Sequence, residues 1–231
     1  VESMGLHADM TAGLSLGEYC AIAVAGGMCD LDAIRTVRSR GIFMEHAAPE
    51  GSGAMSAVLG MDAEVIEDVL NGREGVSIAN YNCPGQIVIT GEADAVAEAG
   101  TALKEAGARR VLPLKVSGPF HSPMMRPAGE ELAKVFAGVS MNPLKIPYVA
   151  NINAEVITDC GRIEGLLVEQ VSGSVRWQQS VETMIREGVD TFVEIGPGKT
   201  LTGFLRKIDK NVKAYHIGSW EEAVQVCEEL K

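Results

Sequence analysis

Gly13-Leu14-Ser15-Leu16-Gly17 is the stretch of this 231-residue sequence that restricts the fold most narrowly. It has the form G-x-S-x-G and ends an expected short strand at residues 7–13. The alanine-rich residues 16–28 follow and are predicted to form a helix. A serine on such a strand-to-helix turn stands above the edge of a sheet, at the N-terminus of the helix. The stretch therefore predicts an α/β fold and makes Ser15 a candidate nucleophile.

The residues around Ser15 carry further expectations. We expect Gly13 and Gly17 both to be required, because bulkier residues two positions from the serine would clash in a strained turn. The Leu16 N–H, at the start of the helix, is expected to stabilise an oxyanion. The alternative interpretation is a glycine-flanked turn with an incidental serine, which the five-residue pattern alone does not exclude.

Length and composition indicate one large domain, or one domain with a smaller insert. The chain is 46% hydrophobic and has 31 acidic against 20 basic residues, a net charge of −11. This balance argues against general nucleic-acid binding, which needs a basic surface. No run of 18 apolar residues predicts a membrane span. Five cysteines without C-x-x-C spacing indicate reduced thiols in the cytoplasm and no zinc site.

A second pattern begins after the Gly51-Ser52-Gly53 break. It predicts the order β-α-β-β-α-β, which is typical of a ferredoxin-like unit. The expected strands are 54–60, 76–81, 86–90 and 110–116, and the expected helices are 62–70 and 93–106. We therefore divide the chain into a core, residues 1–52 and 118–231, and an inserted small subdomain, residues 53–117.

The rest of the core is expected to alternate helices and strands. Asp30 is the expected N-cap of a helix whose apolar face carries Leu31, Ile34, Val37, Gly41 and Met44. Ser122-Pro123 indicates another helix start. A strand is expected at 146–151, helices at 163–171 and 175–187, a strand at 191–195, a helix from Lys199 and an amphipathic stretch at 221–230. Gly196-Pro197-Gly198 is interpreted as a structural turn.

A serine nucleophile needs a base, and the chain has four histidines: His7, His46, His121 and His216. His121 lies in a loop between a strand end and a helix start, where catalytic side chains concentrate. Position alone still favours an ordinary surface histidine, so the choice depends on the neighbouring motifs.

Five motifs occur in order along most of the chain, from about Met10 to Gly203. Together they resemble the malonyl-CoA:acyl carrier protein transacylase family, the acyltransferases of type II fatty-acid synthesis. The motifs are Gly13-Leu14-Ser15-Leu16-Gly17-Glu18-Tyr19, Arg40-Gly41, Asn82-Cys83-Pro84-Gly85-Gln86, Gly118-Pro119-Phe120-His121-Ser122 and Glu194-Ile195-Gly196-Pro197-Gly198.

The resemblance implies an α/β-hydrolase-like core with a parallel sheet and an inserted ferredoxin-like subdomain. It implies a Ser–His dyad in which Ser15 is the nucleophile and His121 is the general base and then the general acid. The family orients its histidine through a main-chain carbonyl, and the matching position is Gln170. A carbonyl acceptor at Nδ1–H fits this role because it leaves Nε2 free for the serine. The alternative for Gln170 is an ordinary polar residue near a helix end.

The resemblance also assigns substrate-binding residues. Arg40 matches the arginine that binds the malonyl carboxylate, for which a planar guanidinium is suited. The helical spacing places Arg40 at the border of the apolar face. Asn82 and Gln86 match a loop beside the active site, although the same residues are ordinary turn formers. Phe120 matches small-acyl members and would narrow the pocket.

The implied reaction moves malonyl from coenzyme A to the phosphopantetheine thiol of acyl carrier protein through a malonyl-serine intermediate. The expected partners are malonyl-CoA and acyl carrier protein, with no nucleic acid, no membrane, no metal and no other cofactor. Two alternatives stay open: a serine thioesterase or hydrolase, and a non-catalytic truncated acyltransferase that binds carrier protein. The candidate basic docking clusters are Arg109, Arg110 and Lys115, or Lys199, Arg206, Lys207 and Lys210.

Two features depart from the family. Leu14 stands where the family usually has histidine, so hydrogen bonding next to Ser15 is expected to differ. A Gly-Gln-Gly-x-Gln strand-turn, which supplies the second oxyanion N–H in the family, is not found in these residues. Three explanations stay open: a truncated sequence, an error in the gene model, or a segment supplied by another chain.

Overall fold

A computed structural model describes residues 1–230. The helices are α1 (Leu16–Val24), α2 (Asp30–His46), α3 (Ala63–Leu70), α4 (Ala93–Glu105), α5 (Arg126–Phe136), α6 (Ile163–Ser172), α7 (Trp177–Arg186), α8 (Thr200–Ile208) and α9 (Trp220–Glu229). The strands are β1 (Thr11–Ala12), β2 (Gly53–Leu59), β3 (Val76–Cys83), β4 (Gln86–Glu92), β5 (Arg110–Pro113), β6 (Tyr148–Val149), β7 (Val156–Ile157), β8 (Thr191–Ile195) and β9 (Lys213–Ile217). Short 3₁₀ helices are η1 (Glu2–Met4), η2 (Pro123–Met125) and η3 (Cys160–Arg162).

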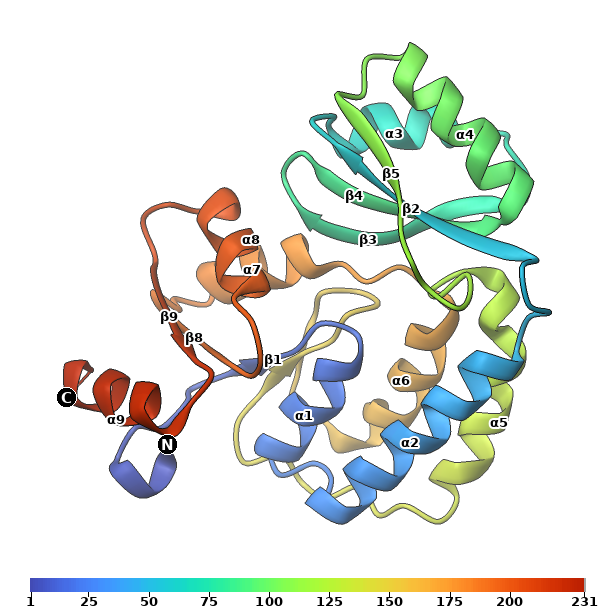
Figure 1. Ribbon diagram of the computed structural model, residues 1–231. Coiled ribbons are helices and arrows are strands. Elements are labelled where there is room, and N and C mark those ends of the chain that lie inside the picture. Colours follow the sequence, from blue (N-terminus) through green and yellow to red (C-terminus); the bar gives the residue numbers. More distant parts are fainter. Residues whose placement is uncertain (231) are drawn as a thin grey trace.

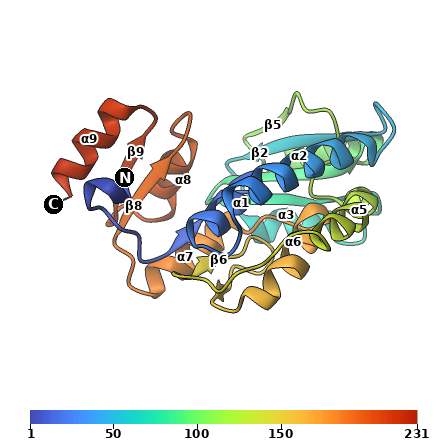
Figure 2. The same ribbon diagram turned by 90° about the horizontal axis from the view of Figure 1, so that it is seen from below.

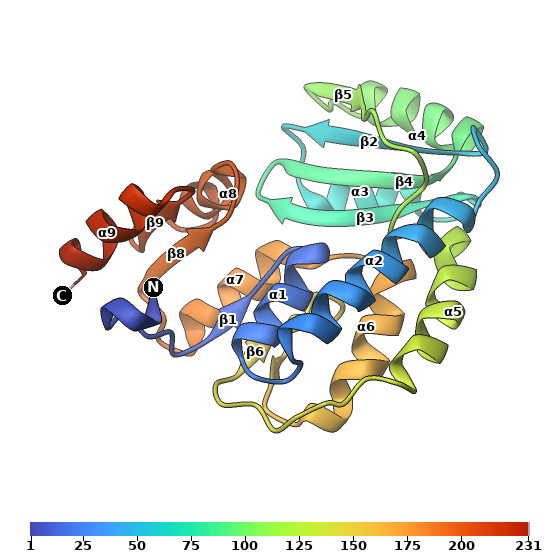
Figure 3. The same ribbon diagram turned by 60° about the horizontal axis from the view of Figure 1, so that its bottom comes forward.

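The core surrounds a small mixed sheet. β1 runs parallel to β6, with Thr11 opposite Tyr148, and β6 is antiparallel to β7. α1, α2, α5 and α6 lie around these strands (Figure 1), and their inward faces share an apolar cluster that includes the fully buried Ile22, Leu132 and Leu167. The start of α1 faces the neighbouring four-stranded sheet (Figure 3). The fold therefore places the Ser15 turn where the two parts of the chain meet.

Two core strands and the first helix are shorter than predicted. The expected strand at residues 7–13 pairs only at Thr11–Ala12, and the expected strand at 146–151 pairs only at Tyr148–Val149. α1 ends at Val24, ahead of the predicted end at residue 28. The reason is Gly26, whose φ of 85° takes the chain out of the helix.

The second helix differs from its prediction at both its start and its face. Its N-cap is Cys29, whose Sγ accepts a hydrogen bond from the Asp32 N–H, so Asp30 is the first helical residue. Ile34, expected on the apolar face, is 67% exposed. The face turned inward consists of Ala33, Thr36, Arg40 and Met44. Arg40 is thus a buried residue of α2 and not a border residue.

The small subdomain has the predicted element order, β2-α3-β3-β4-α4-β5. Its four strands form an antiparallel sheet in the order β3-β4-β2-β5, the arrangement of a ferredoxin-like unit. α3 and α4 cover one face (Figures 1 and 3), where Ile66, Ile89 and Leu103 are fully buried. A second apolar cluster of this sheet, formed by Met55, Ala79 and Val88, packs against Phe120 of the core. The boundaries at residues 53 and 117 remain a prediction.

The edge of this sheet is joined to the core by main-chain hydrogen bonds. The Val175 N–H donates to the Ala79 carbonyl over 2.8 Å, and the Tyr81 N–H donates to the Val175 carbonyl over 2.9 Å. Val175 follows α6 and precedes α7. These bonds tie β3 to the segment that carries Gln170.

The C-terminal elements β8, α8, β9 and α9 stand beside the helices α1 and α2, with the N-terminus next to α9 (Figure 2). β8 and β9 run parallel, and Val1 and Met4 pack against the apolar cluster of Ile217, Ala223 and Val226. Glu194 of β8 accepts hydrogen bonds from the N–H groups of Leu201 and Thr202 and so holds the start of α8. Among residues 1–230, every helix is too short or too polar to span a bilayer.

Candidate active site

Ser15 occupies a strained turn between β1 and α1. Its φ of 53° and ψ of −102° are unusual for a residue with a side chain. A Cβ on Gly13 would lie 2.0 Å from the Gly17 carbonyl oxygen, so Gly13 is required where the chain before Ser15 passes close to the first turn of α1. A Cβ on Gly17 would meet no described atom within 4 Å. The prediction that both glycines are sterically required is therefore wrong for Gly17.

Two amide side chains hold this turn in place. The Asn151 side chain accepts from the Ser15 N–H and donates to the Gly13 carbonyl, both over 2.7 Å. The Gln170 side chain donates from Nε2 to the Ser15 carbonyl over 2.8 Å. Both residues are fully buried. Asn151 has no local signature in the sequence, because it follows β6 and reaches Ser15 only through the fold.

His121 lies beside the Ser15 hydroxyl. Its Nε2 is 2.7 Å from Ser15 Oγ, and its Nδ1 is 2.9 Å from the Gln170 carbonyl oxygen. Because a carbonyl can only accept, Nδ1 carries the proton and Nε2 is free to accept from the serine. Burial, followed by the nearby positive charge of Arg40, lowers the pKa of His121 to about 4. The imidazole is therefore neutral near pH 7.

Arg40 reaches the same place from α2. Its Nη2 donates to Ser15 Oγ over 2.9 Å and to Gln170 Oε1 over 3.1 Å. The guanidinium lies 5.6 Å from the centre of the Tyr19 ring, and the residue is only 6% exposed. Arg40 Nε is buried and has no hydrogen-bond acceptor within residues 1–230. The guanidinium thus has donor capacity left for an anionic ligand.

Glu18 is the second buried residue that the sequence analysis missed. Its side chain has no exposed surface; Oε2 accepts from Gln170 Nε2 over 2.8 Å and Oε1 accepts from the Asn151 N–H over 3.3 Å. Burial raises the pKa of Glu18 to about 8, against the opposing effects of these hydrogen bonds and of Arg40. The available signal was the Ser15-x-x-Glu18 spacing of a capping box. In the structure the Ser15 N–H bonds to Asn151 instead.

Leu16 and Leu14 lie on either side of Ser15 in the sequence and have different surroundings. Leu16 is the first residue of α1, and its N–H has no acceptor among the described residues. This N–H can therefore receive a ligand oxygen at the positive end of the helix. Leu14 packs against the apolar cluster of Cys83 and Val175.

The remaining predicted residues, Phe120, Asn82 and Gln86, have different surroundings. Phe120 directly precedes His121 and packs against apolar clusters of both the core and the small sheet. Asn82 is buried on β3. Gln86 begins β4 and accepts from Lys207 Nζ over 3.3 Å. Within residues 1–230, neither amide hydrogen-bonds to Ser15, whereas His121, Arg40 and Gln170 do.

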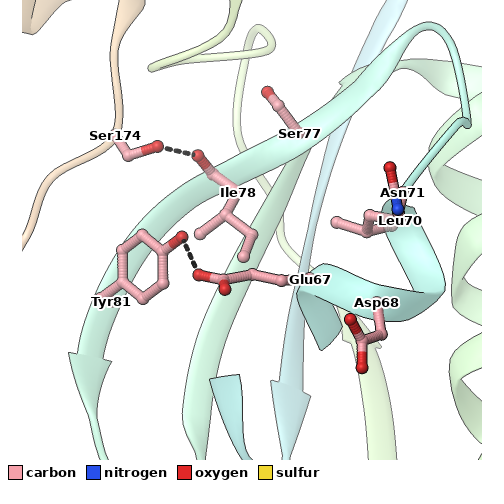
Figure 4. A pocket seen from close by; sticks show the side chains of 8 residues that line it. All are labelled: Glu67, Asp68, Leu70, Asn71, Ser77, Ile78, Tyr81 and Ser174. Atoms are coloured by element: carbon pink, nitrogen blue, oxygen red, sulfur yellow. Dashed lines mark hydrogen bonds between the residues drawn. The ribbon is translucent and has the colours of Figure 1, made fainter. Parts of the chain in front are cut away.

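Two cavities differ in their relation to these residues. One of about 820 Å³ lies between α1 and α2 and is lined in part by Leu16 and Tyr19. The other, of about 440 Å³, lies between α3 and β3 and contains none of the site residues. There Tyr81 donates to Glu67, and Ser174 donates to the Ile78 carbonyl (Figure 4). Residues 1–230 contain no cluster of three or more metal-ligating side chains.

Comparisons with known proteins show which family this chain resembles. Residues 1–226 match the family model described as an acyl transferase domain. The malonyl CoA-acyl carrier protein transacylase of Bacillus subtilis (strain 168) is 45% identical over 98% of this chain and 73% of its own length. The crystal structure of the Clostridium perfringens transacylase has a TM-score of 0.95 at 39% identity, over 99% of this chain and 73% of its own.

A further solved structure is a malonyl-transacylase in complex with its type II PKS acyl-carrier protein. It has a TM-score of 0.93 at 39% identity, over 99% of this chain and 75% of its own. These matches confirm the α/β fold class expected from the sequence, a core with a small subdomain; the core sheet is mixed and not wholly parallel, because β7 runs antiparallel to β6. The chain therefore belongs to the acyl transferase domain family, and within it to the malonyl CoA-acyl carrier protein transacylases.

Proposed function

We propose that this chain transfers malonyl from coenzyme A to the phosphopantetheine thiol of acyl carrier protein through an ester on Ser15. The observation that carries the proposal is the meeting of three groups at one hydroxyl: Ser15 Oγ lies 2.7 Å from His121 Nε2 and 2.9 Å from Arg40 Nη2. A nucleophile, a neutral base and a guanidinium are what transfer of a carboxylate-bearing acyl group requires. The names of the relatives support the same substrates.

In the first half-reaction, His121 Nε2 takes the proton of the Ser15 hydroxyl while Oγ attacks the thioester carbonyl carbon. The Leu16 N–H donates to the oxyanion that forms, and the Gln170 carbonyl stabilises the imidazolium through Nδ1–H. The C–S bond then breaks, and the coenzyme A sulfur leaves with the proton from His121. The product is malonyl-Ser15.

In the second half-reaction, His121 takes the proton of the carrier thiol, and the sulfur attacks the ester carbonyl. The C–O bond to Ser15 breaks, and Oγ recovers its proton from His121. Both steps move only an acyl group and protons, so the proposed reaction needs no metal or redox cofactor.

Arg40 is assigned to the malonyl carboxylate. It is buried beside the nucleophile and keeps donor groups unsatisfied. An acyl group without a terminal carboxylate leaves this charge unpaired in a site with little water, which disfavours its binding. Phe120 and Asn82 are assigned to the pocket wall, with Gln86 further out at the start of β4.

A serine hydrolase would use the same Ser15 and His121, so the fate of the ester decides between the two activities. Malonyl-CoA and holo acyl carrier protein are mixed with the protein. The two products that are then quantified are the malonyl thioester of acyl carrier protein and free malonate. The transferase assignment predicts malonyl carrier protein as the main product, lost in Ser15→Ala. Free malonate as the main product supports a thioesterase. Absence of both products, with carrier protein still bound, supports a non-catalytic binding protein.

The proposed partners are malonyl-CoA and acyl carrier protein, without nucleic acid or membrane. The proposed compartment is the cytoplasm, in line with five free cysteines in the structure.

A further inference from the structure

The Glu18 carboxyl group lies beneath the nucleophile turn without touching the nucleophile's side chain. It accepts from the side-chain amide of Gln170 and from the main-chain N–H of Asn151. These two residues are 152 and 133 positions away in the sequence. One carboxyl group of α1 therefore links α6 and the segment after β6 beneath Ser15.

Both of these residues hold the reacting groups. Asn151 bridges the Gly13 carbonyl and the Ser15 N–H, and so spans the turn from both sides. Gln170 fixes the Ser15 carbonyl with its side chain and His121 Nδ1 with its main-chain carbonyl. The same Gln170 side chain accepts from Arg40. A shift of Gln170 would therefore displace the serine and the histidine together, while Arg40, which is held on α2, would lose one hydrogen bond.

We propose that Glu18 is a positioning residue for acyl transfer, acting through Gln170 and Asn151 to hold Ser15 and His121 in line; this rests on the function proposed above. The strained backbone of Ser15 needs such support, because a residue at positive φ persists only where its surroundings fix it. An oxygen of a carboxyl group accepts a hydrogen bond whether or not the group is protonated. Glu18 therefore offers an acceptor to both donors at once.

Glu18→Gln is the variant that tests this role. The amide keeps the size of the side chain but replaces one acceptor oxygen with an NH₂ group, which can only donate. That NH₂ group must then face the Asn151 N–H or Gln170 Nε2, so one of the two links is lost. Glu64→Gln is the matched control, because Glu64 is also in the first turn of a helix and is exposed.

The measurement is the single-turnover rate of malonyl-Ser15 formation, followed by quenched-flow mass spectrometry, together with the KM for malonyl-CoA and the midpoint of thermal unfolding. We expect Glu18→Gln to acylate roughly 100-fold more slowly, the usual effect of a displacement of about 1 Å in reacting groups. KM should change little, because the carboxylate-binding Arg40 is retained. Glu64→Gln should match the wild type.

Gln170→Met tests the same link from the other side, because it removes the side-chain amide but keeps the carbonyl that faces His121. If Glu18 acts through Gln170, the acylation rate of the double variant Glu18→Gln/Gln170→Met should lie within about threefold of the rate of Gln170→Met. The proposal is wrong if the fold-reductions in acylation rate of the two single variants multiply in the double variant. A wild-type acylation rate in folded Glu18→Gln also overturns it. If Glu18→Gln does not fold, a wild-type rate in Gln170→Met overturns it.

These outcomes are separate from a failure of the proposed function. Wild-type protein and Glu64→Gln that form no malonyl-Ser15 contradict the acyl transfer itself. Wild-type protein that is acylated normally, with an equal rate in Glu18→Gln, contradicts only the role of Glu18.

Discussion

Arg40 donates from Nη2 to the Ser15 hydroxyl over 2.9 Å, so the residue assigned to the substrate's carboxylate lies against the residue assigned to attack its carbonyl. A malonyl group carries its carboxylate and its thioester carbonyl on either side of a single methylene carbon. Selection of the acyl group and its activation therefore take place at one point of the structure, with His121 on the other side of the same hydroxyl.

Replacing Arg40 should relax the choice of acyl group. Arg40→Ala is expected to reduce kcat/KM for malonyl-CoA relative to acetyl-CoA by about 10²-fold, because loss of a buried charged partner costs roughly 3 kcal/mol. Competition between the two thioesters, read by mass spectrometry of the acylated protein, measures the ratio. The control is Arg35→Ala, an exposed arginine of the same helix. An unchanged ratio in Arg40→Ala contradicts the assignment.

The acid limb of the pH profile should lie well below the ordinary pKa of histidine. Burial and Arg40 lower the pKa of His121 from 6.5 to about 4, and only the neutral imidazole is a base. The acylation rate is therefore expected to stay constant as the pH falls through 6.5 and to decline near pH 4. A stopped-flow profile of acylation measures this limb. A midpoint at or above 6.5 shows that His121 is not the buried base described here.

Glu18 should make the protein less stable as the pH rises. Its pKa is raised from 4.5 to about 8. Its contribution to the free energy of unfolding is therefore complete below pH 4.5 and is lost as the pH rises to 8. His121 has the opposite effect: its pKa is lowered, so its contribution is complete above pH 6.5 and is lost as the pH falls through 4. The Glu18 effect is thus isolated between pH 6.5 and 8.

Urea unfolding across that range tests the effect of Glu18. The free energy of unfolding of the wild type should fall from pH 6.5 to 8, and the fall should be smaller in Glu18→Gln, which has no ionisable group at this position. Equal slopes in the two proteins would show that Glu18 does not titrate in this window.

The two glycines of the turn should respond differently to alanine. Gly13→Ala brings a Cβ within 2.0 Å of the Gly17 carbonyl oxygen and is expected to cost roughly 3 kcal/mol or more. Gly17→Ala meets no described atom within 4 Å and lies in a helix, where alanine gains roughly 0.5–1 kcal/mol over glycine. Thermal unfolding of both variants decides this. Equal losses in the two contradict the geometry of the turn.

The sequence predicted those parts of the site that have a local signature. The G-x-S-x-G turn and the β-α-β-β-α-β order follow from short-range patterns, and both are present in the structure. The meeting of Ser15 with His121, 106 residues apart, was inferred from family motifs and not from periodicity. Arg40 was placed on the edge of an apolar face, but the inward face of α2 has Arg40 within it.

Glu18 and Asn151 were missed because their partners are distant in the sequence. Each is an ordinary polar residue until the fold brings α1, β6 and α6 together, and hydrogen bonds across more than 130 residues leave no local pattern. The short strands β1 and β6 were overestimated for a related reason. Apolar composition indicates burial, but pairing depends on where the partner strand ends.

The site of the acyl-enzyme ester tests the central claim most directly. The protein is mixed with malonyl-CoA alone, quenched in acid and digested, and the malonylated peptide is sequenced by tandem mass spectrometry. The account predicts one malonyl group, on Ser15, that is released when holo acyl carrier protein is added before the quench. No adduct on the wild-type protein, or an adduct on another residue that persists in Ser15→Ala, would contradict it.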